Sequence, residues 1–339
     1  MTPQQLSTRL SSLLTNRIDF SVMIWGPPGI GKSSIVADVA AKAGMDMVDV
    51  RLSQLAPTDL RGLPIVGGPT TDKEQTRWCP PDFLPRGGKG VLFLDEFNMA
   101  PPAMQGVAQQ LILDRRVGSY KLPAGWCVWA AGNRREDRAS VFEMPAPLAN
   151  RFIHLEMQPD LESFKQYALG NGISEGIIGF LGARPALLHK PDPNGPAWPS
   201  PRSWEMASRL EAADLTGECA VGKAAWTEYT AYKRLCETLP SIERILHSGG
   251  ADQPLPPQID LRFAACTALA MRADSAEQAV NAFTWVRKGL DDEWVAVFTH
   301  DLKRSMVAKG LQGTFINAMN AQPAFRSFIE SRTKVMVAA

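Results

Sequence analysis

The sequence has almost no net charge, few cysteines and no long hydrophobic run. Its 36 Lys and Arg residues against 35 Asp and Glu residues leave a formal net charge of +1, which counts against nucleic-acid binding through bulk charge. The five cysteines never form a Cys-x-x-Cys pair and the four histidines are dispersed, so we expect neither a disulfide framework nor a structural zinc site. No apolar run reaches the roughly 18 residues that a membrane helix needs.

The first 20 residues also lack the long apolar segment and the cleavage site of a signal peptide. We therefore expect a cytoplasmic protein with reduced thiols and no membrane partner. Hydrophobic residues make up 45% of the chain and charged residues 21%, which is typical of a globular protein. The 27 Gly and 26 Pro residues predict many loops rather than a bare helical bundle.

The hydrophobic pattern divides the chain into an α/β part and an all-helical part. Short β-prone runs alternate with helical periodicity as far as residue 157, which predicts a parallel sheet flanked by helices. The expected strands are 20–25, 45–52, 91–96, 126–133 and 152–157, and the expected helices lie at 4–17, from Lys32 onward and at 102–114. Beyond Asp160 the expected elements are all helices, at 160–169, 174–182, 203–215, 220–238 and several between 257 and 331. We predict an α/β core at 1–158, a helical lid at 159–250 and a C-terminal helical extension at 251–339.

A glycine-rich loop directly follows the first expected strand and opens the next helix. The segment from Gly26 to Ser33 fits the pattern G-x-x-x-x-G-K-[ST] at every position, which is typical of a phosphate-binding loop. Its backbone N–H groups and the helix N-terminus favour phosphate, Lys32 reaches the β- and γ-phosphates, and the Ser33 hydroxyl is a ligand for Mg²⁺. The predicted ATP-binding residues of this segment are Gly26, Pro27, Pro28, Gly29, Ile30, Gly31, Lys32, Ser33 and Ser34.

Two adjacent carboxylates end the buried strand at 91–96. Asp95 is in position to hold Mg²⁺ opposite Ser33, and we count it among the ATP-binding residues. The next residue, Glu96, is the candidate general base that polarises the attacking water. Asn133 closes the strand at 126–133, and if that strand lies beside the Asp95 strand its amide points at the same crevice. From the residues alone, Asn133 is equally an asparagine that caps a turn.

The order of these motifs resembles that of the AAA+ ATPases, most closely the MoxR-type branch. The phosphate loop, VLFLDE, AAGN, the segment from Leu148 to Phe152 and Ser-Pro-Arg202 follow one another as in that family, from about residue 20 to residue 215. The resemblance implies that Asn133 is sensor 1, that Arg151 is an arginine finger inserted into the neighbouring subunit, and that Arg202 is sensor 2. It also implies a homo-hexameric ring and a partner that carries a von Willebrand factor A (VWA) domain.

Other features leave two interpretations open. The Pro- and Gly-rich segment 55–90 is expected to be mostly loop or a small hairpin insertion. Its residues Arg61, Trp78 and Phe83 either contact a partner or a pore, or pack locally under a loop. Arg134 and Arg135 line a subunit interface or pore, or form a solvated basic face, and we favour the solvated face.

We therefore predict an ATP hydrolase that remodels a protein client. The alternative is an ATPase of the same fold that acts on DNA or RNA, against which the near-zero net charge and the lack of a nucleic-acid module count.

Overall fold

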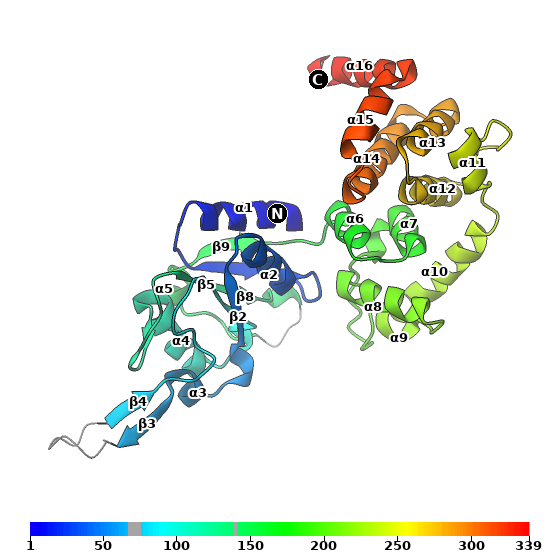
Figure 1. The fold of residues 1–339 in the computed structure, drawn as a ribbon. Coiled ribbons are helices and arrows are strands. Elements are labelled where there is room, and N and C mark those ends of the chain that lie inside the picture. Colours follow the sequence, from blue (N-terminus) through cyan, green and yellow to red (C-terminus); the bar gives the residue numbers. More distant parts are fainter. Residues whose placement is uncertain (67–75, 138–140, 339) are drawn as a thin grey trace. The chain divides into compact units, whose positions relative to one another are not determined.

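The computed structural model describes residues 1–66, 76–137 and 141–338, and the chain separates into two compact units (Figure 1). Unit 1 spans Met1–Asp160 and unit 2 spans Leu161–Ala339. The further division of the helical part at residue 250 stays a prediction.

A five-stranded parallel sheet forms the centre of unit 1. Its strands are β1 (Val22–Trp25), β2 (Asp46–Arg51), β5 (Gly90–Asp95), β8 (Trp126–Gly132) and β9 (Ile153–Glu156), in the spatial order β2-β5-β8-β1-β9. All four neighbouring pairs are parallel. The predicted fold class, a parallel sheet flanked by helices and followed by helical regions, is confirmed.

The sheet is apolar on both faces because helices cover both of them. On one face, α1 (Pro3–Thr15) and α2 (Lys32–Lys42) pack on β-strand side chains that include the fully buried Trp129. On the other face, α4 (Pro102–Asp114) and α5 (Ala146–Ala149) pack on Leu92, Leu94 and their neighbours. This explains the unbroken apolar run of β5, since a strand buried on both sides has no solvent-facing positions.

The Pro- and Gly-rich insertion contains a hairpin, one of the two arrangements that its sequence left open. After the short helix α3 (Pro57–Arg61), strands β3 (Leu63–Val66) and β4 (Thr76–Cys79) pair in antiparallel fashion and protrude from the sheet of unit 1 (Figure 1). Residues 67–75 of the insertion lie outside the described residues. A second small hairpin, β6 (Arg116–Val117) and β7 (Tyr120–Lys121), was not predicted.

Unit 2 consists of helices joined by loops, and its described residues contain no strand. Its α-helices are α6 (Leu161–Gly170), α7 (Glu175–Ala183), α8 (Pro201–Ala212), α9 (Glu218–Val221), α10 (Lys223–Cys236), α11 (Ile242–Ser248), α12 (Ile259–Arg272), α13 (Ala276–Gly289), α14 (Asp292–Ala308), α15 (Gln312–Ala321) and α16 (Pro323–Ala338). In the described part of the chain, no helix is both long and apolar enough to span a bilayer.

In unit 2 one prediction is wrong and one helix was missed. The single helix expected at 220–238 is wrong, because Gly222 at φ +84° separates α9 from α10. A left-handed φ is incompatible with helix continuation, and glycine tolerates it best. The short helix α11 was not predicted.

Candidate active site

The glycine-rich loop connects β1 to α2 at the carboxyl edge of the sheet. A Cβ atom on Gly26 would lie 2.6 Å from the backbone oxygen of Met157, so the strand end and the loop meet too closely for a side chain. Gly31 precedes the first residue of α2 with φ +90°, the left-handed region in which glycine is favoured. The loop therefore turns directly into a helix N-terminus, and the first N–H groups of a helix, which lack partners within the helix, favour an anion.

Other loop residues divide between the core and the helix start. Ile30 is buried against the cluster that includes α1 and α2. Ser33 is half-buried in the first turn of α2, whereas Ser34 is exposed. Of the two serines, Ser33 is thus the one partly enclosed beside the loop.

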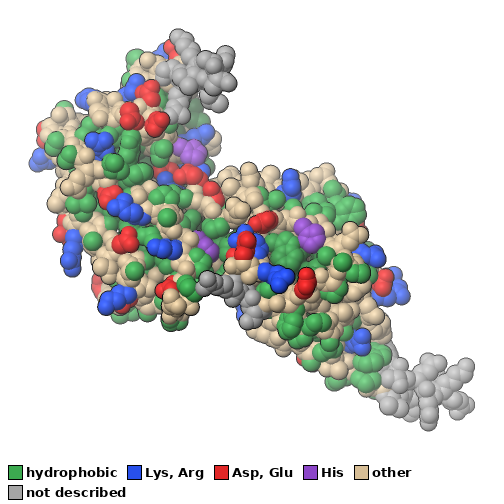
Figure 2. Space-filling view, turned by 180° about the vertical axis from the view of Figure 1, so that it is seen from behind, with side chains coloured by type: hydrophobic (Ala, Val, Ile, Leu, Met, Phe, Trp, Pro, Cys, Tyr) green, Lys and Arg blue, Asp and Glu red, His purple; other side chains and the backbone are tan. Residues whose placement is uncertain are grey.

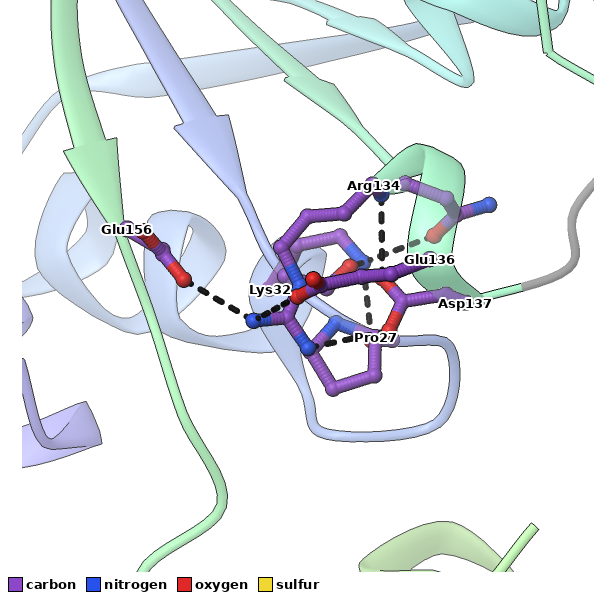
Figure 3. Close-up of polar contacts among 8 residues, drawn as sticks. Pro27, Lys32, Arg134, Glu136, Asp137 and Glu156 are labelled. Carbon is purple, nitrogen blue, oxygen red and sulfur yellow. Dashed lines mark hydrogen bonds and ion pairs between the residues drawn. The ribbon is translucent and has the colours of Figure 1, made fainter.

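Lys32 joins the loop to the end of strand β8. Its Nζ donates to the backbone oxygens of Gly26 at 2.7 Å and Pro27 at 3.0 Å, and to Asn133 Oδ1 at 3.1 Å. Figure 3 shows Lys32 beside Pro27. The structure thus brings together two predicted site residues that are 101 positions apart in the sequence.

The strand order explains this meeting. Strands β5 and β8 are parallel neighbours, with Leu94 opposite Ala130. Asp95 and Asn133 therefore leave the sheet at the same edge, and β1, on the other side of β8, delivers the loop there. In α/β sheets, ligands bind at this carboxyl edge.

Asp95 and Glu96 form a sharp turn at the end of β5. Glu96 has φ +53° and ψ +34°, an unusual conformation for a residue with a side chain, and its N–H donates to Asp95 Oδ1 at 2.8 Å. Its carboxylate accepts a hydrogen bond from the Ser53 hydroxyl. Backbone strain of this kind is found often at functional sites.

Burial raises the pKa of Asp95, while the Glu96 N–H and the Lys32 ammonium oppose this shift. Burial and the charge of Asp95 also raise the pKa of Asp49 on β2, and the Arg51 guanidinium lowers it. Arg51 lies opposite Asp95 in the β2–β5 register. Three acidic groups gather at this edge, Asp49, Asp95 and Glu96, and the nearby cations Arg51 and Lys32 compensate only part of their charge. Such a cluster favours a metal cation or another counter-charge.

Asn98 holds the backbone of Asn133 with both atoms of its amide. Asn98 Nδ2 donates to Asn133 O at 2.7 Å, and Asn133 N donates to Asn98 Oδ1 at 3.2 Å. Asn98 is only 4% exposed, so these bonds form in a dry environment where an unpaired amide would be unfavourable. The residue that ends β8 is thereby fixed relative to the turn that carries Glu96.

Arg134 is bound by carboxylates, so its interpretation as part of a solvated basic face is wrong. Its guanidinium makes a bidentate pair with Asp137, at 3.1 Å and 2.9 Å, and contacts Glu156 at 2.8 Å and Glu136 at 2.7 Å (Figure 3). The hydrogen bond with Asp137 raises the pKa of Arg134. The loop after Asn133 is thus tied to β9. Arg135, in contrast, is exposed.

Arg151 lies on a tight turn between α5 and β9. The Phe152 N–H closes this turn by donating to Ala149 O at 3.2 Å. Leu148 and Phe152 are buried on either side, and the Phe152 ring packs edge-on against Phe97. The exposed Arg151 side chain therefore projects from a turn whose flanks are anchored in the core.

Arg202 belongs to unit 2, in the first turn of α8. The helix begins with a capping box, in which the Ser200 side chain accepts from Ser203 N and the Ser203 side chain accepts from Ser200 N. The Arg202 side chain is exposed. As the sequence predicted, Arg202 opens a helix of the helical part.

A comparison with known families agrees with this geometry. Residues 21–152, which hold the loop, Asp95, Glu96, Asn133 and Arg151, match the family model described as the AAA domain of the dynein-related subfamily. The chain contains an AAA-type ATPase domain. That domain extends from just before β1 to the turn before β9.

The individual proteins that are similar to the chain share little of its sequence. Midasin from Giardia intestinalis is 26% identical over 147 residues, which are 41% of this chain and only 3% of that protein. The structure of NtrX from Brucella abortus in complex with ADP covers 92% of this chain and 68% of its own, at 16% identity and a TM-score of 0.40. A RuvB mutant from Thermotoga maritima covers 92% and 85%, at 14% identity and a TM-score of 0.37.

Several residues around the site escaped the sequence analysis. Ser53, Arg51 and Asp49 come from β2 and the turn after it, and they reach Asp95 or Glu96 only because β2 pairs with β5. Asn98 stands two positions after Glu96. This closeness to the carboxylate pair is the feature of the sequence that could have marked Asn98 as a site residue.

Proposed function

We propose that the chain hydrolyses Mg-ATP at the subunit interfaces of a head-to-tail ring and uses the energy to remodel a protein client together with a VWA-domain partner. The observation that carries this proposal is the meeting of Lys32 with Asn133 beside the strand that ends in Asp95 and Glu96. These side chains have the charges and donors that phosphoryl transfer requires.

Lys32 and the loop amides bind the phosphates in this proposal. The ammonium group now donates to two loop carbonyls and to the Asn133 amide, so it already points into the concave side of the loop. A β- or γ-phosphate oxygen replaces one of these acceptors at little geometric cost. The helix N-terminus of α2 adds favourable partial charge.

Ser33 and Asp95 are the residues that would hold Mg²⁺. A hydroxyl and a carboxylate are hard oxygen ligands of the type that Mg²⁺ prefers. The raised pKa of Asp95 fits the same assignment, because a cation beside the buried carboxylate would stabilise its charged form. When bound, the ion neutralises phosphate charge.

Glu96 and Asn133 act on the attacking water. Glu96 accepts its proton, and the Ser53 hydroxyl fixes one carboxylate oxygen so that the other remains available. Asn133 orients the water with a neutral amide, and Asn98 holds its backbone in place. Positioning of this kind accounts for much of the catalysis of phosphoryl transfer.

Arg151 completes the site of the neighbouring subunit. Its exposed side chain on an anchored turn is available to another copy of the chain. A head-to-tail contact that uses a different surface on each subunit closes into a ring, and we propose a hexamer. Arg202, on the helical lid, contacts the γ-phosphate and transmits its loss to the lid.

The charge distribution on the face drawn in Figure 2 favours a protein client over a nucleic acid. Among the described side chains on the face drawn in Figure 2, basic and acidic groups are intermixed and form no continuous basic stripe. A nucleic-acid motor usually needs such a stripe for the phosphate backbone. The VWA-domain partner rests on the MoxR-type resemblance of the motifs between residues 20 and 215.

A mixing experiment tests the inter-subunit site. Lys32→Ala and Arg151→Ala should each reduce ATP hydrolysis on the order of a thousandfold or more. A mixture of the two should regain activity, because the Lys32→Ala subunit still donates its arginine to an intact nucleotide site. Arg9→Ala, which removes an exposed arginine from α1, is the matched control and should hydrolyse ATP normally. A mixture without regained activity, in assemblies of normal size, would contradict the proposal.

A further inference from the structure

Trp25 connects the glycine-rich loop to the neighbouring strand through its side chain. It is the last residue of β1 and directly precedes Gly26. Its indole Nε1 donates to His154 Nδ1 on β9 at 2.8 Å, and the two ring planes lie within 9° of parallel. An N–H···N hydrogen bond between two flat rings is directional, so it restrains the orientation of both rings.

This bond also determines which nitrogen of His154 carries the proton. Because Nδ1 accepts from an indole that can only donate, the proton of the neutral imidazole resides on Nε2. Nε2 lies 2.8 Å from the backbone oxygen of Ala149 and therefore donates to it. Both ring nitrogens are used, and His154 bridges Trp25 to the end of α5.

The Ala149 carbonyl is the same group that closes the turn carrying Arg151. It accepts from Phe152 N at 3.2 Å and from His154 Nε2 at 2.8 Å. The two donors lie one and three residues after Arg151, so a single oxygen fixes the start of this turn relative to the strand that follows. A continuous path of hydrogen bonds runs from the residue before the loop to the turn of the exposed arginine.

We propose that Trp25 and His154 are positioning residues that couple the nucleotide loop of one subunit to the arginine that this subunit offers to its neighbour. The inference rests on the proposed function, since it requires Arg151 to act in the adjoining site. A shift of the loop on binding or losing nucleotide moves Trp25, and the rigid rings pass this shift to Ala149. Each site thereby reports its occupancy to the next site around the ring.

The alternative is that the two rings simply pack the edge of the sheet. Packing requires only the shape of the two rings, whereas positioning also requires the hydrogen bonds of the His154 nitrogens. His154→Phe keeps a flat ring of similar size and its contact with Phe152, but it can neither accept from Trp25 nor donate to Ala149. His154→Gln is the matched variant, because an amide oxygen accepts and an amide nitrogen donates. Trp25→Phe removes the indole donor and leaves His154 in place.

In rings of one variant, the kinetic parameters separate the two roles. His154→Phe and Trp25→Phe should each lower kcat for ATP roughly tenfold, because the loss of one hydrogen bond in the path misplaces Arg151. The KM for ATP should stay within about twofold, since an arginine that acts on the transition state contributes little to ground-state binding. His154→Gln should restore most of the rate. The double variant should be no slower than either single variant, because both break the same path.

Mixed rings test whether His154 acts through the arginine of its own subunit. The reference mixture combines Lys32→Ala subunits, which donate Arg151, with Arg151→Ala subunits, which hold intact nucleotide sites. His154→Phe is then added either to the donating subunit or to the site-bearing subunit. We expect roughly a tenfold loss of regained activity in the first mixture and an unchanged rate in the second, where the local arginine is already absent.

Each other outcome overturns a defined claim. Equal losses in the two mixtures would mean that His154 supports the fold or its own site, and would overturn the coupling. Full activity in both mixtures would do the same. No regained activity in the reference mixture would overturn the inter-subunit arginine, and this inference with it. Trp25→Phe in the same two placements repeats the test if His154→Phe does not fold.

Discussion

Lys32 Nζ and Asn133 Oδ1 lie 3.1 Å apart, although the first residue opens α2 and the second follows β8. The contact places the ammonium group proposed to bind phosphate next to the amide proposed to orient the attacking water. Because the amide is neutral, it leaves the ammonium available to a negatively charged ligand.

Replacing that amide by a carboxylate should therefore impair nucleotide binding. Asn133→Asp would form a close ion pair with Lys32 that competes with phosphate, so we expect ATP affinity to fall at least tenfold and hydrolysis to be lost. Asn133→Ala removes the amide proposed to orient the water, together with its hydrogen bond to Lys32, but adds no charge; it should lower kcat about a hundredfold with ATP affinity nearly unchanged. Titration with a fluorescent ATP analogue and steady-state assays measure both quantities. Equal ATP affinities of the two variants would contradict this interpretation of the contact.

Asn98 should matter for turnover through its two hydrogen bonds to the backbone of Asn133. Asn98→Ala leaves the Asn133 N–H and C=O without their partners, and should cost about 1–3 kcal/mol of unfolding free energy. It should also lower kcat by more than tenfold through misplacement of Asn133, with little change in ATP affinity. Asn171→Ala, at an exposed position of unit 2, is the control for both measurements. An unaltered kcat in a destabilised Asn98→Ala protein would assign Asn98 a purely structural role.

Asp95 should lower the stability of the free protein at neutral pH. Its pKa is raised by burial, so the native state binds the proton more tightly than the unfolded chain does. The associated stability is present below the ordinary pKa of about 3.8 and is lost as pH rises through the higher native value.

Asp95→Asn keeps the acceptor for the Glu96 N–H and removes this charge. Measured by thermal unfolding in EDTA without nucleotide, its Tm should exceed that of the unaltered protein by a few degrees at pH 7.5, and by less at pH 4. ATP hydrolysis should be abolished at the same time. A variant that is less stable at pH 7.5, or equally shifted at both pH values, would refute the proposed burial cost.

The break between α9 and α10 should depend on Gly222. A Cβ atom there would lie 2.7 Å from the backbone oxygen of Ala197, and φ is +84°. Gly222→Ala should therefore reduce the free energy of unfolding of unit 2 by about 1–3 kcal/mol in denaturant titrations. Gly170→Ala, where an added Cβ meets no atom within 4 Å, should change it by less than about 1 kcal/mol. Similar effects of both substitutions would argue against strain at Gly222.

The sequence predicted the elements that follow from local patterns. Buried strands such as β5 are recognisable as continuous apolar runs, and the start of α2 at Lys32 follows from the glycine-rich loop. Once β5 and β8 are neighbours, the position of Asn133 beside the loop is a consequence of parallel strand order.

The contacts that surround these residues were not predictable in the same way. Arg134 looked like one of two adjacent solvated arginines. Its pairs with Glu136 and Asp137 are local, but its pair with Glu156 joins it to β9, 22 residues later. The Trp25–His154 bond spans 129 residues and leaves no local periodicity. Such side-chain pairs depend on which strands are neighbours in the sheet, and the local pattern of a single sequence does not predict the strand order.

The most direct test of the central claim is ATP turnover together with ATP binding in Glu96→Gln. The substitution preserves the size of the side chain and the acceptor for Ser53 while removing the proposed base. The account predicts that the purified variant retains ATP at least as tightly as the unaltered protein, and that its kcat falls by a factor on the order of a hundred or more. Near-normal hydrolysis by Glu96→Gln, or an unaltered protein that neither binds nor hydrolyses ATP, would contradict it.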